Sequence, residues 1–280
     1  NFSNIILDYV FIYLFKWGMF GASFATGIGP VISICCLSAH FIKKQNQFKL
    51  IKTRFLLHTV ADFCKLGISS FVNELSTGAV IMIFNFLFLG LGGNTAVAAY
   101  GIVANVALFA VSIFTGIAQG IQPLVSDYYG KSMTGQLKAV LKDAVVVALV
   151  LTAAIVAFSN LFNDGIVALF NKSGDPLLQS IAKEGITIYF LGFFPGSLNI
   201  VLAGYLSAME KAEKGFIISL LRGLVIIAPS AWLLSRFFGM TGVWTAIPVT
   251  ETITLLAALL MLKKTIYPPL SSSETPQLPV

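Results

Sequence analysis

The sequence predicts an all-α protein that crosses a membrane several times. Hydrophobic residues make up 57% of its 280 residues and charged residues only 11%, with a mean hydropathy of +0.88. Soluble domains carry roughly 25% charged residues. The apolar residues fall in runs of about 20, the length that an α-helix needs to cross the hydrocarbon core. We therefore expect about eight transmembrane helices in this chain.

The expected membrane helices follow the apolar runs. They cover residues 3–16, 21–42, 67–91, 95–124, 139–161, 179–207, 215–236 and 241–262. The Gly-Phe-Phe-Pro-Gly run at 192–196 interrupts the sixth helix, Pro229 the seventh and Pro30 the second. Discontinuous helices are a feature of transporters that work by alternating access. The basic segment 43–58 is expected to be a cytoplasmic linker between two bundles, and residues 266–280 a disordered tail.

The distribution of Lys and Arg predicts the orientation of these helices. With residue 1 on the cytoplasmic side, loops on that side hold twelve basic residues, and the other side holds four, which are Lys16, Lys172, Lys183 and Arg236. Cytoplasmic loops carry the excess of positive charge in membrane proteins. We therefore expect a multi-pass protein of the inner (plasma) membrane with its C-terminus in the cytoplasm.

Residues 17–25 resemble residues 238–246, at a constant offset of 221 positions. Both copies contain Gly-Met-x-Gly and continue through an apolar helix to a pair of lysines. Six expected spans separate the copies, so both cross the membrane in the same direction, as in transporters built from parallel repeats. Residues 1–42 would then be the last two helices of one six-helix lobe and residues 59–265 the whole of the next. The first span is short and the chain begins with Asn1, so we expect a fragment that lacks four helices at its front. Two chance Gly-Met-x-Gly turns are the alternative interpretation.

Glu74 places a carboxylate inside a helix long enough to cross a bilayer. An ionisable group at that depth is costly, and it marks an ion, proton or cationic substrate site by default. The residues that share its helical face, at spacings of three and four, are Ser70, Thr77, Gly78, Ile81 and Asn85. We predict that Glu74 takes part in cation or proton coupling.

The next expected span carries a second polar stripe at helical spacing. It consists of Asn105, Ser112, Thr115, Gln119, Gln122 and Ser126, with Tyr100 nearer the outer end. Two adjacent polar faces can line a water-filled cavity, and they can also simply join helices through hydrogen bonds. We predict that the residues lining a substrate cavity include Asn85, Tyr100, Asn105, Gln119 and Gln122.

Glu251 is the second carboxylate within an expected span. Pro248 has no N–H, so the carbonyl of Trp244 loses its helical partner. This carbonyl and the carboxylate would form an oxygen site for Na⁺ or a proton relay. Further oxygens come from the hydroxyls of Thr245, Thr250 and Thr254. The alternative is a proline kink that serves packing, with Glu251 paired to Arg222 of the preceding span, and the two interpretations are compatible.

The sequence contains no constellation typical of an enzyme or a metal site. Its three cysteines and two histidines have no metal-ligand spacing, and it has neither a phosphate-binding loop for ATP nor a nucleophile elbow. The net charge of +6 does not indicate nucleic-acid binding, because the basic residues are not clustered with aromatic residues on a polar face. We therefore expect no enzyme, no metal site and no resident cofactor, with transport energy coming from an ion gradient.

Four stretches carry a family resemblance. They are Asn4-Ile5-Ile6-Leu7-Asp8 followed by Gly18-x-x-Gly21-Ala22-x-x-Ala25-Thr26, Ser70-Phe71-x-x-Glu74-Leu75-Ser76-Thr77-Gly78, Gly92-Gly93-Asn94-Thr95-Ala96-Val97-Ala98-Ala99-Tyr100-Gly101-Ile102, and Gly116-Ile117-Ala118-Gln119-Gly120-Ile121-Gln122-Pro123. On the basis of these four stretches, residues 1–265 resemble the multidrug and toxic compound extrusion (MATE) family, most of all its bacterial, staphylococcal-type multidrug exporters.

The resemblance implies twelve helices in two six-helix lobes around a central cavity. It also implies export of cationic, often aromatic, compounds against entry of Na⁺ or H⁺. The family's acidic residue on the first helix of the second lobe corresponds to Glu74, and Tyr100, Asn85 and Gln119 correspond to cavity-lining positions. Some relatives carry an acidic residue in the middle of the fourth helix of that lobe. This sequence departs from that pattern, with Gly192, Pro195, Ser197 and Asn199 in the same region.

From these observations we predict a monomeric antiporter, coupled to Na⁺ or H⁺, that exports cationic or aromatic drugs by alternating access. Its partners would be small-molecule cations and membrane lipid, and not nucleic acid. The alternative is a lipid-linked oligosaccharide flippase of the same superfamily. A flippase would need several basic residues in its cavity to hold an anionic head group, whereas only Arg222 lies deep within an expected span.

Overall fold

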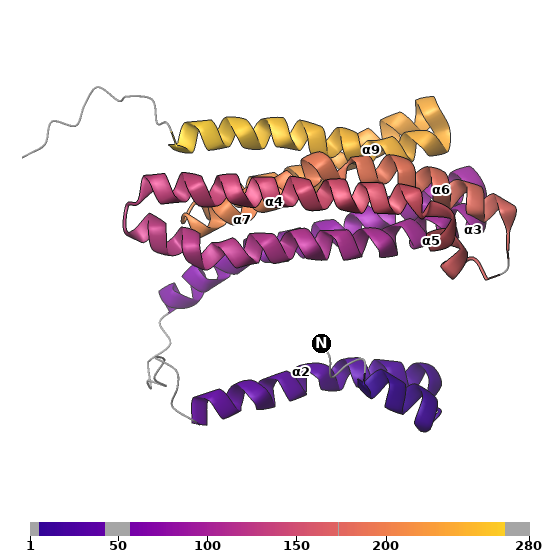
Figure 1. The fold of residues 1–280 in the computed structure, drawn as a ribbon, viewed down its shortest axis with the longest axis horizontal. Coiled ribbons are helices and arrows are strands. Elements are labelled where there is room, and N and C mark those ends of the chain that lie inside the picture. The colour runs from indigo at the N-terminus through magenta and orange to yellow at the C-terminus, as the bar shows by residue number, and fades with distance from the viewer. Residues whose placement is uncertain (1–5, 43–56, 173, 267–280) are drawn as a thin grey trace, which may run out of the picture. The chain divides into compact units, whose positions relative to one another are not determined.

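The computed structural model describes residues 6–42, 57–172 and 174–266. For residues 36, 37, 39–42, 57–74, 212 and 263–266 it describes the backbone alone. All regular elements in the described part are helices, and the chain forms two units, residues 1–57 and 58–280 (Figure 1). Most of the expected linker and tail, residues 43–56 and 267–280, lies outside the described residues, and the assignment of residues 1–42 and 59–265 to two lobes stays a prediction.

The first unit consists of a short helical segment and a long helix joined by a glycine turn. The π-helix η1 covers Tyr9–Leu14 and α2 covers Gly18–Ile42. Gly18 has a φ of 55°, in the left-handed region where only glycine is free of strain. A Cβ on Gly21 would lie 3.0 Å from the carbonyl oxygen of Phe11, so the second glycine lets the two segments approach closely.

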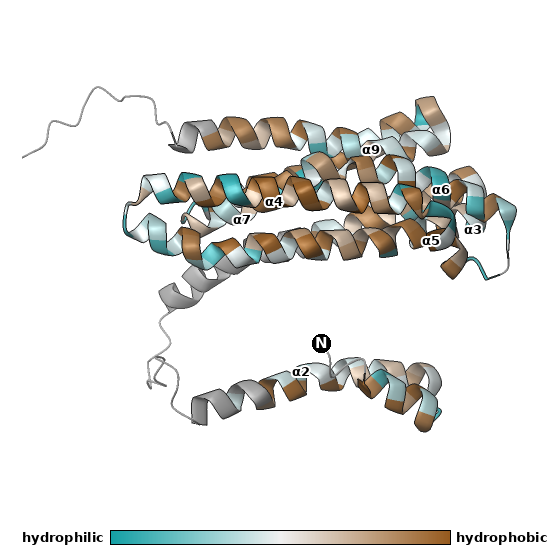
Figure 2. Ribbon diagram, viewed as in Figure 1, coloured by the Kyte–Doolittle hydropathy of each residue, from teal (hydrophilic) through white to brown (hydrophobic). Residues whose placement is uncertain are grey.

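The second unit is a bundle of helices. Its elements are α3 (Leu57–Gly130), α4 (Thr134–Leu161), α5 (Asn163–Phe170), α6 (Pro176–Leu191), α7 (Phe193–Ala208), α8 (Ala212–Leu220), the π-helix η2 (Leu221–Val225) and α9 (Ile227–Ile266). Hydrophobic residues cover the middle of these helices and hydrophilic residues gather at both ends of the bundle (Figure 2). This distribution matches a bilayer, whose apolar core lies between two polar surfaces.

Four helical stretches among the described residues are long and apolar enough to cross a membrane: Gly18–Cys35, Leu75–Gly130, Thr134–Leu161 and Glu213–Leu262. The bent pair of α6 and α7 makes a fifth if it is counted as one span. A straight helix of 56 residues would measure roughly 84 Å, far more than a hydrocarbon core of about 30 Å. The two longest stretches must therefore each cross more than once.

Glycines divide these two stretches at the expected loops. Gly93 has a φ of 65° and Gly239 a φ of 59°, and both lie outside the helical region of backbone conformation. Gly93 falls between the expected spans 67–91 and 95–124, and Gly239 between 215–236 and 241–262. The structure describes the expected span 3–16 only from residue 6, and the described part is too short to be counted as a membrane span. The total of eight spans therefore stays a prediction. Gly93 and Gly239 nevertheless interrupt the helices at the positions where loops between spans were expected.

The predicted interruption of the sixth span is confirmed. α6 ends at Leu191, α7 begins at Phe193, and the two axes differ by 48°. A Cβ on Gly192 would lie 2.8 Å from a side-chain carbon of Ile247, so the missing side chain lets the bend pack against α9. Of the other two expected breaks, Pro229 lies in the first turn of α9, whereas α2 continues through Pro30 as one helix.

A buried aromatic cluster joins α3 to α9. The rings of Phe88 and Trp244 lie 4.4 Å apart between centroids, and Tyr100 lies 5.4 Å from Phe88. Gly185 of α6 faces the indole, since a Cβ there would lie 2.7 Å from a ring carbon of Trp244. In lipid, helices associate through close packing of small residues rather than through the hydrophobic effect. The pairing of a glycine with the largest side chain therefore fixes α6 against α9.

The internal sequence repeat is also a repeat of local structure. Gly239 has a positive φ of 59°, close to the 55° of Gly18, its equivalent 221 positions earlier. Gly242, the equivalent of Gly21, approaches the preceding helix even more closely, because a Cβ there would clash with the backbone carbonyl oxygen of Leu234. Both copies of the motif thus form a turn in which the first glycine reverses the chain and the second makes room for it.

Candidate functional site

Glu251 lies in the buried interior of the second unit with both carboxylate oxygens hydrogen-bonded. Oε1 accepts hydrogen bonds from Nη2 and Nε of Arg222, at 2.6 and 3.1 Å. Oε2 accepts one from Nδ2 of Asn199, at 2.7 Å. Three N–H donors from two other helical elements therefore hold the carboxylate, which is the condition under which a buried charge is tolerated.

Arg222 reaches Glu251 from the π-helical turn η2. Such turns place an extra residue in a helix and occur frequently at functional sites. The neighbouring Gly223 brings η2 against α3, because a Cβ there would lie 2.6 Å from the Cβ of Ser76. The side chains of Arg222 and Glu251 are only 22% and 10% exposed, so they form a largely desolvated ion pair. Removing either partner would leave an uncompensated charge between the helices.

Asn199 of α7 completes this cluster. Its side chain is fully buried, and its Nδ2 also donates to the backbone carbonyl of Glu251, at 2.9 Å. Gly196, one turn earlier, admits the carboxylate, because a Cβ there would lie 3.3 Å from its carbon atom Cδ. A single amide in an apolar helix does not identify its partner. The only sequence signal for Asn199 is its place in the helix segment where this chain lacks the acidic residue that some relatives carry.

The three threonines expected around Glu251 have different surroundings. Thr245 donates to the carbonyls of Thr241 and Gly242, at 3.0 Å each. Within the described part of the chain, the hydroxyls of Thr250 and Thr254 are buried without a hydrogen-bond partner, and so is Oδ1 of Asn199. Thr250, Glu251 and Thr254 share one face of α9 by helical spacing.

A cavity of about 490 Å³ borders the ion pair. Arg222 and Glu251 both line it, and so do three of the five predicted cavity residues, Tyr100, Gln119 and Gln122. Asn85 and Asn105 are not among the lining residues, and the amide of Asn105 donates instead to the carbonyl of Gly101 at 2.8 Å.

Sequence reasoning missed three polar residues of the cavity wall. Tyr189, Ser207 and Ser219 come from α6, α7 and α8, where no polar stripe marks them. One signal could have found Ser219, which precedes Arg222 by three residues and so lies on the same helical face.

Glu74 lies on α3, but its side chain falls outside the described residues. Thr77, on the same helical face, lines the cavity, and Ser76 contacts η2 at Gly223. This part of α3 therefore runs beside the cavity, while the coupling role of Glu74 stays a prediction.

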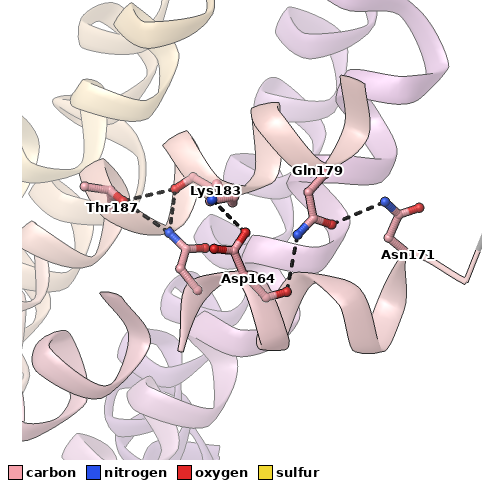
Figure 3. A network of polar contacts seen from close by, with 6 residues as sticks. Asp164, Asn171, Gln179, Lys183 and Thr187 are labelled. Atoms are coloured by element: carbon pink, nitrogen blue, oxygen red, sulfur yellow. Dashed lines mark hydrogen bonds and ion pairs between the residues drawn. The ribbon is translucent and has the colours of Figure 1, made fainter. Parts of the chain in front are cut away.

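A second polar network joins the short helix α5 to α6 (Figure 3), at one end of the bundle (Figure 1). Lys183 forms an ion pair with Asp164 at 2.6 Å, and the amide of Gln179 donates to the carbonyl of Asp164 at 3.2 Å. The amide of Asn171 donates to Gln179 in turn, at 3.3 Å. None of these residues lines the cavity, and their contacts fix the connection between α5 and α6.

The Asp164–Lys183 pair should contribute little to stability. The hydrogen bond from Lys183 lowers the pKa of Asp164, so any stabilisation is present above the usual Asp pKa and is lost as the pH falls through the lowered value. Because the Asp164 side chain is 77% exposed, solvent screens the pair. We expect Asp164→Asn to leave the melting temperature unchanged within error at neutral and at acid pH. A clear loss of stability that persists in acid would instead show a structural role unrelated to charge.

A comparison with protein families identifies the chain. The family model described as MatE matches residues 70–233, which is more than half of the sequence. The chain belongs to the MatE family. This MatE chain is therefore a multi-pass membrane protein of a multidrug efflux transporter family and not an enzyme.

Individual relatives agree with this family membership. The multidrug export protein MepA of Staphylococcus saprophyticus is 26% identical over 260 residues, and that of Staphylococcus aureus strain NCTC 8325 is 28% identical over 264 residues. Each alignment covers 92% of this chain and 56% of the relative, so the chain spans just over half the length of these curated relatives.

The fold also has solved counterparts. An outward-facing structure of a multidrug resistance MATE family transporter of the MOP superfamily matches this MatE chain with a TM-score of 0.86. The match covers 94% of this chain and 60% of that one, at 21% identity. At that identity the likeness shows the fold alone.

Proposed function

We propose that this MatE chain is part of a cation-coupled antiporter that exports cationic or aromatic drugs and other toxic compounds by alternating access. The observation that supports the proposal best is the Glu251–Arg222 ion pair at the wall of a cavity between membrane helices. An ionisable residue inside a membrane protein that faces a cavity marks an ion or substrate path by default. The relatives named above are multidrug export proteins, which favours drugs as the cargo.

The chemistry of the cavity wall suits an amphiphilic cation. Tyr100 and Tyr189 offer aromatic surface, and Gln119 and Gln122 offer amide groups that can accept or donate hydrogen bonds. Small-molecule sites usually combine apolar walls with a few placed polar groups, and this cavity also has apolar residues such as Val80, Val111 and Ile200 in its wall. Aromatic faces also attract organic cations directly.

The same wall disfavours a flippase. Arg222 is the one basic residue among the described lining residues, and Glu251 neutralises it. An anionic head group would need positive charge that is not already paired. We therefore keep the drug exporter as the proposed function of this cavity.

Alternating access would use the interruptions of the helices beside the cavity. The bend at Gly192 lies against Ile247 and Pro248 of α9, three to four residues from Glu251. Hinges are a few residues at element ends that absorb large changes of backbone conformation. In the proposed cycle, Glu74 and Glu251 exchange Na⁺ or H⁺ with the cargo, without a resident cofactor. The protein would act as a monomer in the plasma membrane, in contact with lipid and with its C-terminus in the cytoplasm.

A dye-accumulation assay tests the proposed function. Cells with and without the full-length protein would be loaded with ethidium, and the Na⁺ and H⁺ gradients would be collapsed separately. We expect the protein to lower dye accumulation, and we expect that effect to vanish when the coupling gradient is collapsed. Equal accumulation in both strains with all gradients intact would contradict drug export. Export that survives collapse of both gradients would contradict cation coupling.

Replacing Glu74 by glutamine should abolish export while leaving the protein in the membrane. The amide preserves size but cannot carry the negative charge that holds a cation or the proton that replaces it. Drug resistance of cells that produce the variant is the measurement, with the amount of membrane-inserted protein measured alongside. The matched control is Asp127→Asn, which changes an exposed carboxylate paired with Lys131 and should keep resistance. Undiminished export by Glu74→Gln would remove Glu74 from the mechanism.

A further inference from the structure

We propose that the Gly239 turn of α9 binds the head group of an anionic phospholipid, with Arg236 as the residue that holds the phosphate. Neither residue lines the cavity, and the site is independent of what the protein transports. Arg236 is exposed, and within the described part of the chain neither a carboxylate nor any other group accepts a hydrogen bond from its guanidinium. Arg222 differs from it, because two nitrogens of that guanidinium donate to Glu251. Arg236 is therefore a cation whose counter-ion has to come from elsewhere.

Trp232 holds this cation from one helical turn earlier. The carbon Cζ of Arg236 lies 5.6 Å from the centroid of the Trp232 ring, which is the geometry of a cation–π contact. The contact restrains the guanidinium without using its N–H groups as hydrogen-bond donors. An arginine presents these donors as a planar fork that binds the oxygens of a phosphate in pairs. The pair of Trp232 and Arg236 thus offers a restrained donor group to an oxyanion.

The surroundings of the cation are apolar and aromatic. The side chains of Trp232, Leu233, Phe237 and Phe238 are each more than half exposed. An exposed apolar patch of this kind marks a contact with another molecule or with a membrane. A free phosphate ion would leave these side chains in water. A phospholipid matches both parts of the surface, because its phosphate can bind Arg236 while its acyl chains cover the apolar side chains.

The turn lies at the depth where lipid head groups are found. Residues 240–266 form a helix of roughly 40 Å, which is enough to cross a hydrocarbon core of about 30 Å once. The turn at Gly239 therefore lies at a membrane surface, at the same end of the bundle as α5 (Figure 1). Tryptophan is enriched at this level of the bilayer, and arginine side chains extend to it from apolar helices.

The carboxylates at this end of the bundle are already engaged. Glu184 of α6 accepts a hydrogen bond from Thr241. Asp164 forms its ion pair with Lys183, and Asp175 caps α6 by accepting from backbone N–H groups. The charge of Arg236 thus stays open to an external anion. A zwitterionic lipid brings an ammonium group together with its phosphate, and the guanidinium repels that group. A lipid with a net negative charge is therefore the better ligand.

The first copy of the repeat carries the same chemistry. Lys16 and Trp17 directly precede Gly18, and both are exposed. Lys16 has no ion-pair partner among the residues that the structure describes. The ring of Trp17 stacks on Phe11 with 5.3 Å between centroids, and the side chain of Phe20 is exposed as well. Both glycine turns thus present an unpaired cation beside exposed aromatic rings, which supports a common lipid-facing role.

Lipid binding to purified protein tests the proposal. The full-length protein in detergent would be titrated with dioleoylphosphatidylglycerol or dioleoylphosphatidylcholine, and native mass spectrometry would give the dissociation constant of the first bound lipid. We expect the anionic lipid to bind more tightly, and Arg236→Gln to weaken its binding about fivefold, the effect of one basic residue at an anionic membrane surface. Arg236→Lys, which keeps the charge but not the fork, should fall between. The matched control is Lys172→Gln, an exposed cation outside the patch that should bind the lipid like the wild type.

A fluorescence measurement locates the bound lipid. Phosphatidylglycerol with brominated acyl chains should quench tryptophan fluorescence, and Trp232→Phe should remove part of that quenching. Equal affinity of the wild type and Arg236→Gln for phosphatidylglycerol would overturn the proposal, and so would an equal loss in Lys172→Gln, which would show a general effect of charge. Inorganic phosphate that binds as tightly as the lipid would assign an ion site without a lipid. Loss of a dimer in Arg236→Gln, with lipid binding unchanged, would assign the patch to a second copy of the protein and likewise contradict the proposal.

Discussion

The Gly242→Ala variant is expected to unfold far more readily than the wild type. The added Cβ would clash with the carbonyl oxygen and the carbonyl carbon of Leu234, both of which are backbone atoms. No side-chain rotation can relieve such a contact, so the two halves of α9 would have to separate at the Gly239 turn. Overpacking costs typically about 1–3 kcal/mol and occasionally more, and a clash with backbone belongs at the upper end. The measurement is the midpoint of thermal unfolding in detergent, with size-exclusion chromatography as the readout of the folded protein that remains.

Alanine variants at two further glycines provide the comparison for this effect. Gly101 lies in α3 with nothing within 4 Å of an added Cβ, so Gly101→Ala should be neutral or stabilising by up to about 1 kcal/mol, the helix preference of alanine over glycine. Gly21→Ala should fall between the two, because its contact with Phe11 is 3.0 Å. A Gly242→Ala protein that melts like Gly101→Ala would show that the α9 turn does not need this close approach.

Removing the positive partner of Glu251 is expected to be the other severe change. Arg222→Met keeps an unbranched side chain of similar length but leaves the carboxylate with Asn199 as its remaining donor. Breaking a buried ion pair by removing one partner costs about 3–5 kcal/mol. Because this pair borders a cavity, water can reach it, and the lower part of that range is expected. The loss would be measured as a drop in the midpoint of thermal unfolding at neutral pH.

The double variant Arg222→Met/Glu251→Gln distinguishes charge from packing. It removes both charges, and an oxygen of the new amide can still accept from Asn199, so most of the lost stability should return. Arg236→Met is the matched control, since Arg236 is exposed and lies over the ring of Trp232 at 5.6 Å. A double variant that is no more stable than Arg222→Met would show that the arginine stabilises the bundle through its packing and not through its charge.

The features that could be predicted from the sequence are those that depend on local chemistry. Gly93 and Gly239 interrupt the apolar runs, and both take backbone conformations that other residues avoid, so the loops between spans were placed correctly. The Gly-Phe-Phe-Pro-Gly run likewise predicted the bend between α6 and α7. Such signals are readable because a glycine or a proline changes the backbone wherever it stands.

The features that escaped prediction depend on contacts between distant segments. Asn199 and Glu251 are 52 residues apart, and nothing local to either one specifies the other. The π-helical turn that carries Arg222 and the short helix α5 also have no sequence signature of their own. Asn105 stays a prediction, because its spacing matches the polar stripe while its amide donates to the carbonyl of Gly101 in its own helix.

The glycine turns have a practical consequence for anyone who labels this protein. At Gly93 and Gly239 one helix passes into the next with scarcely a residue between them, so an inserted epitope or fluorescent tag would pull paired helices apart. The connection between α3 and α4, at residues 131–133, instead lies between the ends of two separate helices. Reporters therefore belong at that connection, where they would leave the two glycine turns intact.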